Sequence, residues 1–291
     1  MTNPRQVFAG ATLAVALKCS EGRFFLRPGS RQLRKFRFLL AHYADKHGIE
    51  LHGFVFMSNH FHLVLTDPRR RLPRFMEEFD SMVARVLNHD LGRSGKFWEA
   101  TPYRSWLLET PAEVLEHLVY LATNPVSAYL VRHPNRWPGL ISLPSHVGTT
   151  QEVRPPRGGL FGRRSKSTLP KRATLRLPLP PHFEDLHRFR RLFEQALQLR
   201  LAELHARPGT YAGRDSVKRR DPFSAPASAA GGPSFSLLPA LTNATKEKRQ
   251  GLTRWRQGVR DAYYRWLVDK TTRFPRGTYR VVVHYKARLV S

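Results

Sequence analysis

The residues best suited to chemistry are two histidines separated by a single residue. His60 and His62 lie in the run HFHLVL, whose composition predicts a β-strand. Because side chains alternate between the faces of a strand, both imidazoles point to one side and Phe61 to the other. Two imidazoles placed in this way can bind one divalent metal, but the spacing also fits two hydrogen-bonded structural histidines. A metal would need a third ligand from elsewhere in the chain.

A predicted helix over residues 111–124 carries two further polar side chains. It begins at Pro111, directly after Thr110, and Pro125 is expected to end it. Tyr120 and Asn124 are four residues apart, so they share one face near the end of this helix. Each also has a simpler interpretation, Tyr120 as a half-buried core residue and Asn124 as a cap before Pro125.

Four other residues compete for a place in such a site. Asn59 directly precedes His60 and fits a tight turn as well as it fits a site role. His52, on the preceding predicted strand, is expected to be structural. Tyr129 and Tyr103 are rival phenols, of which Tyr129 is expected to pack because it follows the predicted helix end.

The elements that must position these residues follow from hydrophobic periodicity. The patterns predict an alternation of strands and helices in the order βαββαβα, which matches the split βαβ, ferredoxin-like arrangement. This is an α+β fold with an antiparallel sheet. The predicted strands cover residues 11–19, 49–56, 61–65 and 97–108, and the predicted helices cover residues 30–47, 72–91 and 111–124.

Taken together, several segments resemble the REP-associated tyrosine transposases, a branch of the single-tyrosine HUH transposases. The resemblance covers about residues 20–143, and FPRGTYRV at 274–281 is similar to the end of a C-terminal extension found in some members. The segments are MSNHFHLVLTDP at 57–68, LPRFMEEFDSMVARVLN at 72–88, FWEATPYRSWLL at 97–108, YLATNPVSAYLV at 120–131 and Trp137-Pro138-Gly139.

The resemblance implies a specific site on the same ferredoxin-like fold. His60 and His62 would bind Mg²⁺ or Mn²⁺, Asn124 would be the third ligand, and Tyr120 would be the nucleophile in DNA transposition and recombination. A phosphotyrosine link retains the bond energy for rejoining, so cleavage and religation become one reversible transesterification. The chain departs from the family at Tyr129, where the pattern has glycine.

The charge of the chain indicates a polyanionic partner. Its 291 residues contain 49 lysines and arginines against 22 acidic residues, a formal charge of +27. The excess lies mainly in residues 151–291, with 30 basic and 10 acidic residues, against 19 and 12 in residues 1–150. Nucleic acid is the first candidate partner.

Two basic helices are predicted in the second half, over residues 184–207 and 245–270. The second carries Trp255, Tyr263 and Trp266 among many cations. Rings at this spacing favour a packed core, whereas the cations favour contact with DNA.

Composition also suggests how the chain is divided. We expect a catalytic domain over residues 1–143, a linker rich in Pro, Gly and Arg over 144–181, and a basic helical extension over 182–291. A mobile loop is expected around residues 222–242, which are rich in Ala, Ser, Gly and Pro. The single Cys19 and the lack of an apolar run of about 18 residues predict a cytoplasmic protein with no membrane partner.

The sequence therefore predicts a metal-dependent transposase or endonuclease. It would cleave and rejoin single-stranded DNA near hairpin-forming repeats through a covalent phosphotyrosine. The alternative is a catalytically silent DNA- or RNA-binding regulator on the same scaffold. The sequence is compatible with a monomer and with a homodimer.

Overall fold

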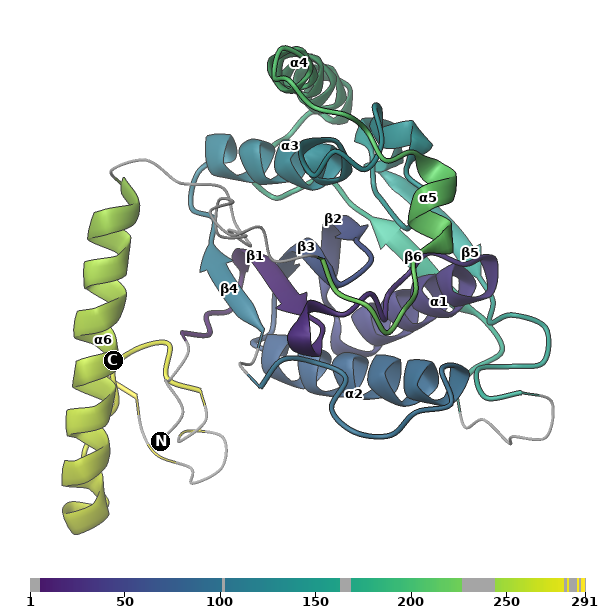
Figure 1. Ribbon diagram of the computed structural model, residues 1–291. Coiled ribbons are helices and arrows are strands. Elements are labelled where there is room, and N and C mark those ends of the chain that lie inside the picture. Colours follow the sequence, from purple (N-terminus) through teal and green to yellow (C-terminus); the bar gives the residue numbers. More distant parts are fainter. Residues whose placement is uncertain are drawn as a thin grey trace. The chain divides into compact units, whose positions relative to one another are not determined.

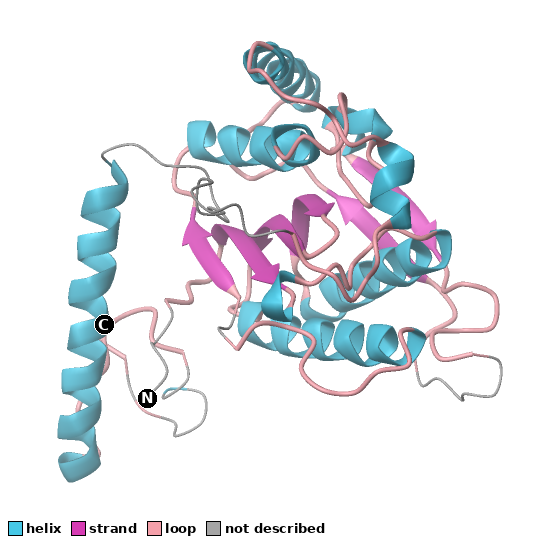
Figure 2. Ribbon diagram, viewed as in Figure 1, coloured by secondary structure: helices cyan, strands magenta, loops and turns pink. Residues whose placement is uncertain are grey.

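The computed structural model describes residues 6–100, 103–162, 169–226 and 244–279, together with 282, 287, 289 and 290. Figure 1 labels the main helices and strands, and Figure 2 shows them by type. In chain order they are β1 (Ala11–Lys18), α1 (Ser30–His47), β2 (Glu50–Phe56), β3 (His60–Asp67), α2 (Leu72–Asp90), β4 (Arg104–Leu107), α3 (Pro111–Ser127), β5 (Thr149–Val153), β6 (Ala173–Leu177), α4 (Leu186–His205), α5 (Arg214–Arg219) and α6 (Ala244–Asp269).

The first seven elements form an α+β fold with a four-stranded sheet. The strand order is β2-β3-β1-β4, and every neighbouring pair is antiparallel. Helices α1 and α2 lie on one side of the sheet and α3 on the other (Figure 1). This is the ferredoxin-like arrangement that the periodicity predicts, and it is confirmed.

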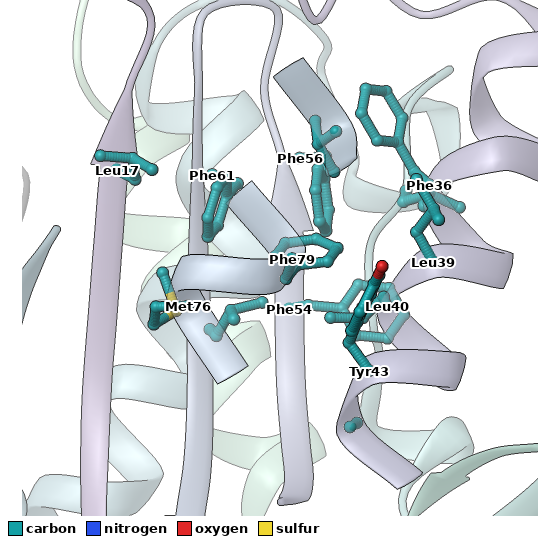
Figure 3. Close-up of a cluster of buried hydrophobic side chains, with 14 of the residues drawn as sticks. Leu17, Phe36, Leu39, Leu40, Tyr43, Phe54, Phe56, Phe61, Met76 and Phe79 are labelled. Atoms are coloured by element: carbon teal, nitrogen blue, oxygen red, sulfur yellow. The ribbon is translucent and has the colours of Figure 1, made fainter. Parts of the chain in front are cut away.

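The main core fills the space between the sheet and helices α1 and α2 (Figure 3). Phe56 and Phe61 stack with ring centroids 5.2 Å apart, and Phe79 of α2 meets Phe61 edge-on at 5.8 Å. All three rings are at most 1% exposed. Phe61 therefore points away from the side that carries His60 and His62, as the alternation predicts.

Local hydrogen bonds fix the helix ends near the sheet. Helix α3 begins with a capping box, in which Thr110 Oγ1 accepts from the Glu113 N–H and the Glu113 carboxylate accepts from the Thr110 N–H. Helix α1 ends at His47 and is capped by Gly48, whose φ of 64° lets its N–H reach back to the carbonyls of Ala44 and Asp45.

The predicted end of α3 at Pro125 is wrong, because the helix continues to Ser127. A proline near the last turn removes a single backbone donor, and the turn is closed by other bonds. The Ala128 N–H donates to the Asn124 carbonyl, and the Leu130 N–H donates to the Pro125 carbonyl. Asn124 therefore lies inside the helix rather than at its cap.

Gly53 of β2 lets α3 approach the sheet closely. A Cβ atom at this position would lie 2.4 Å from Cδ2 of Leu118 on α3, well inside van der Waals contact. The strand also carries a register shift between Leu51 and Gly53. Both features shape the surface on which Tyr120 and Asn124 are held above β3.

The expected linker over residues 144–181 contains a structured hairpin. Strands β5 and β6 pair antiparallel, and Leu175 and Leu177 are buried in the main core, which α1 also lines. Alternation in the run TLRL explains this, because Leu175 and Leu177 point inward while Arg176 stays exposed. The proline, glycine and arginine content of the flanking residues masked that signal.

The described chain divides into two compact units, Gly10–Ser234 and Met1–Ala9 with Phe235–Ser291. This division differs from the expected one, because α4 packs on α3 within the first unit. In the second unit, Trp255, Tyr263 and Trp266 of α6 pack around Val259 and other buried residues, so the core interpretation of these rings is confirmed. Most of the loop expected at 222–242 lies outside the described residues.

Candidate active site

The two histidines of β3 lie side by side beneath α3. Their ring centroids are 4.9 Å apart and their planes nearly perpendicular, at 87°. His60 pairs across the strands with Lys18 of β1, and His62 pairs with Ala16. Both imidazoles are almost fully buried, at 0% and 1% exposure. The predicted placement on one side of the strand is therefore confirmed.

Tyr120 and Asn124 of α3 converge on this pair. The Tyr120 ring meets His62 edge-to-face, with centroids 5.3 Å apart at 87°. The Asn124 side chain hydrogen-bonds to Tyr120 and also to His60. These four residues come from β3 and α3, and 58 positions separate His62 from Tyr120. They form one cluster between the sheet and α3.

Burial keeps the cluster in its neutral form. Loss of solvent lowers the pKa of His60 to about 3, with a further contribution from the charge of Lys18 and an opposing one from the Asn124 hydrogen bond. Burial likewise lowers the pKa of His62, helped by the neighbouring His60. Burial raises the pKa of the Tyr120 phenol to about 12, and the Asn124 hydrogen bond opposes this rise. At neutral pH both imidazoles therefore have lone pairs available.

Asn59 determines which nitrogen of His60 holds the proton. The Asn59 side-chain N–H donates to the Gly22 carbonyl at 3.0 Å, which fixes the orientation of the amide. The other end, Oδ1, lies 2.8 Å from His60 Nδ1 and can only accept. His60 therefore carries its proton on Nδ1, and Nε2 is its unprotonated nitrogen. Asn59 has a site role as well as its place in the turn.

The residues present fit a divalent metal. Both ring nitrogens of His62 are buried and hydrogen-bond to no described residue, which is costly unless another group occupies them. Neutral imidazoles and an amide oxygen are ordinary donors for such an ion. Among the described residues no three His, Cys, Asp or Glu side chains cluster in a way that could hold a metal ion. The Asn124 amide, which lies beside the histidine pair, is a polar donor of a different type.

The rival residues lie elsewhere. The Tyr129 hydroxyl donates to the Pro208 carbonyl at 3.1 Å, and Tyr103 is 8% exposed in the main core. His52 is buried between the Pro178 carbonyl at 3.0 Å and the Thr66 hydroxyl at 2.8 Å. The packing interpretation of Tyr129 and the structural interpretation of His52 are confirmed.

One residue of this region was missed by sequence reasoning. His117 of α3 is fully buried and is close enough for its charge to lower the pKa of His62. Its Nδ1 contacts the Glu113 carbonyl at 2.9 Å. The available signal was its position three residues before Tyr120, on the same helical face.

No family model and no curated protein matches this chain. Among solved structures, it is similar to a REP-associated tyrosine transposase bound to a REP hairpin, with 18% identity over 46% of this chain and 78% of that one, at a TM-score of 0.40. It is also similar to a candidate transposase from Deinococcus radiodurans R1, with 16% identity over 40% of this chain and 95% of that one, at a TM-score of 0.30. These structural neighbours are transposases, but scores this low carry no conclusion about chemistry.

None of the described helices is long and apolar enough to span a membrane.

Proposed function

We propose that this chain is a metal-dependent transposase or endonuclease that cleaves and rejoins single-stranded DNA near hairpin-forming repeats. The observation that carries the proposal is the convergence of Tyr120 on the histidine pair, with ring centroids 5.3 Å apart for Tyr120 and His62 and 4.9 Å apart for His62 and His60. The Asn124 side chain lies beside both Tyr120 and His60. A phenol, two neutral imidazoles and an amide meeting at one point are the parts that a phosphotyrosine transesterase needs.

His60, His62 and Asn124 are the residues that would hold Mg²⁺ or Mn²⁺. When bound, such an ion polarises a nonbridging phosphate oxygen and neutralises the charge that develops on it. Asn59 contributes by holding His60 with its Nε2 lone pair unprotonated.

Tyr120 supplies the nucleophile. Its Oη forms a bond to phosphorus while the bond from phosphorus to the 3′ oxygen breaks, leaving a 5′ phosphotyrosine and a free 3′ hydroxyl. A pKa of about 12 keeps Tyr120 protonated at neutral pH before the step. The phenol gives up that proton as it attacks and the departing 3′ oxygen takes one up from solvent, so the proton count is unchanged. The Asn124 hydrogen bond favours the phenolate form of Tyr120. The edge-to-face contact with the His62 ring orients the Tyr120 ring. A 3′ hydroxyl attacking the phosphotyrosine reverses the reaction and joins strands.

The test is formation of a covalent adduct. Protein is incubated with end-labelled single-stranded DNA carrying a hairpin, with Mg²⁺ or Mn²⁺, and resolved on a denaturing gel. Tyr120→Phe should abolish the adduct and leave binding nearly intact, whereas Tyr129→Phe should leave both unchanged. Tight binding without an adduct under any metal would favour the silent regulator instead.

Metal binding is tested separately by calorimetry with Mn²⁺ on protein without DNA. His62→Ala should weaken Mn²⁺ binding strongly, while Tyr120→Phe should not. Equal Mn²⁺ affinity of His62→Ala and the unaltered protein would remove His62 from the ligand set.

A further inference from the structure

A segment from the basic second half of the chain docks beside the candidate active site. The Phe24 N–H donates to the Ser224 carbonyl at 3.0 Å, and Arg27 donates to the Arg220 carbonyl at 3.0 Å. The Arg220 guanidinium also lies over the Phe24 ring, 4.8 Å from its centroid. Residues 214–224 therefore pack against the loop over residues 19–27, about 200 positions earlier in the chain. Figure 1 shows the green segment after α5 running along the purple loop that leads into α1.

That loop is joined directly to the histidine strand. The Gly22 carbonyl accepts the hydrogen bond from Asn59, which in turn holds His60. The backbone of Cys19 bonds to the Asn59 carbonyl at 2.8 Å, and the Leu26 N–H bonds to the Ser58 carbonyl at 2.9 Å. Residues 214–224 thus form part of the border of the site, although they lie far outside the predicted catalytic domain.

Cations at this border are exposed and uncompensated. Lys96, Lys218 and Arg219 are exposed, and none makes an ion pair with a described residue. Two nearby acids are already engaged, because Glu21 pairs with Arg23 at 2.6 Å and Glu99 pairs with Lys18 at 3.3 Å. The segment over residues 214–224 also carries two exposed acids, Asp215 and Asp221, against four basic residues. Its net positive charge is available to a polyanion.

The segment that carries Lys218 and Arg219 also carries an exposed aromatic ring, Phe223. Phe223 is 44% exposed, although most phenylalanines of this unit are buried. One edge of its ring meets Phe25 at a centroid distance of 6.2 Å, and its carbonyl accepts from Arg23 at 3.2 Å, so its backbone is anchored. A fixed ring with one exposed part beside cations is the usual surface for an unpaired base.

We propose that Lys96, Lys218, Arg219 and Phe223 form a single-strand ridge, a surface that binds unpaired DNA next to the histidine pair. Phe223 stacks on a base and the three cations contact the phosphates on either side. This inference rests on the proposed function, because it names the surface that presents the strand to Tyr120. In double-stranded DNA the bases are already stacked on each other, so none can stack on Phe223. We therefore expect this surface to bind double-stranded DNA less tightly than single-stranded DNA.

The ring is tested by fluorescence anisotropy with single-stranded DNA in the Tyr120→Phe background without metal, where no covalent link can form. Phe223→Leu should weaken binding about 5- to 150-fold, the range for one lost base stack. Phe223→Tyr should bind normally, and binding of a matched duplex should not change. Equal single-strand affinity of the Leu and Tyr variants would overturn the role of the ring.

The cations are tested by the salt dependence of the same binding reaction. Lys218→Gln with Arg219→Gln should lower the slope of log K against log salt by about 1.4, at 0.7 per phosphate contact. Lys171→Gln with Arg157→Gln is the matched control, an exposed lysine and an exposed arginine between β5 and β6 that make no ion pair with a described residue, and should leave the slope unchanged. An equal change in both pairs would show only a general charge effect and refute the ridge.

The two proposals fail in different ways. If DNA binding depends on Phe223 but no adduct forms at Tyr120, the proposed transesterase activity is refuted and the ridge is retained. If an adduct forms at Tyr120 but Phe223→Leu leaves binding unchanged, the ridge is refuted and the proposed activity is retained.

Discussion

Acid should destabilise this protein through its buried neutral histidines. Burial lowers the pKa of His60 to about 3 and that of His52 to about 4, from 6.5 in the unfolded chain. Between the folded and unfolded values, the unfolded chain binds more protons, so the free energy of unfolding falls as the pH falls. The stability that these groups contribute is fully present above pH 6.5 and is lost progressively down to pH 4 and pH 3.

The expected loss can be worked from these values. Lowering the pH from 7 to 5 should cost about 2 kcal/mol for His60 and about 2 kcal/mol for His52, at 1.36 kcal/mol per pKa unit. His62 acts in the same direction. A total of about 4 kcal/mol or more is a large part of the 5–15 kcal/mol that usually stabilises a domain.

Urea unfolding at pH 7, 6 and 5 measures this dependence. His60→Gln removes one titrating group, so the difference in unfolding free energy between pH 7 and pH 5 should shrink by about 2 kcal/mol. His187→Gln, at an exposed position on α4, should keep the full dependence. A His60→Gln variant with the same pH dependence as the unaltered protein would show that His60 protonates without loss of the fold.

Three other predictions follow from the packing and from the site. Gly53→Ala should destabilise the protein by about 1–3 kcal/mol in urea, because the new Cβ would overlap Leu118; no loss would show that α3 moves away freely. Phe79→Ala should cost about 3–5 kcal/mol, and a loss below 1 kcal/mol would contradict its place in the core. Nitrogen NMR without metal should find His60 protonated on Nδ1, and Asn59→Ala should mix the tautomers; a proton on Nε2 in the unaltered protein would refute the assigned hydrogen bond.

Most of the fold around the candidate site could be predicted because its signals are local. Helix α1 was predicted with its observed bounds from apolar spacing, and β3 from its β-rich run. The placement of His60 and His62 on one side follows from strand geometry alone. The helix end predicted at Pro125 was wrong because proline breaks helices mainly in their interior. Near the last turn it removes only one backbone hydrogen-bond donor, and α3 continues to Ser127.

The remaining features depend on contacts between residues far apart in the chain. The Gly22 carbonyl, 37 positions away, fixes the orientation of the Asn59 amide and so its contact with His60. The local turn sequence cannot predict this long-range hydrogen bond. The docking of Phe223 on the loop at Arg23 joins residues 200 positions apart. Local composition predicted a mobile loop around 222–242, and the anchored part of it became visible only in the tertiary structure.

The central claim is that Tyr120 attacks DNA, and mass spectrometry of a trapped adduct tests it most directly. After nuclease trimming and trypsin digestion, Tyr120 and Tyr129 fall in the same peptide, residues 105–132, and Tyr103 in the preceding one. Fragmentation of the 105–132 peptide should place the nucleotide phosphate on Tyr120. A phosphate on Tyr129 or Tyr103, or no modified peptide from a reaction in which DNA was cleaved, would contradict the proposed mechanism.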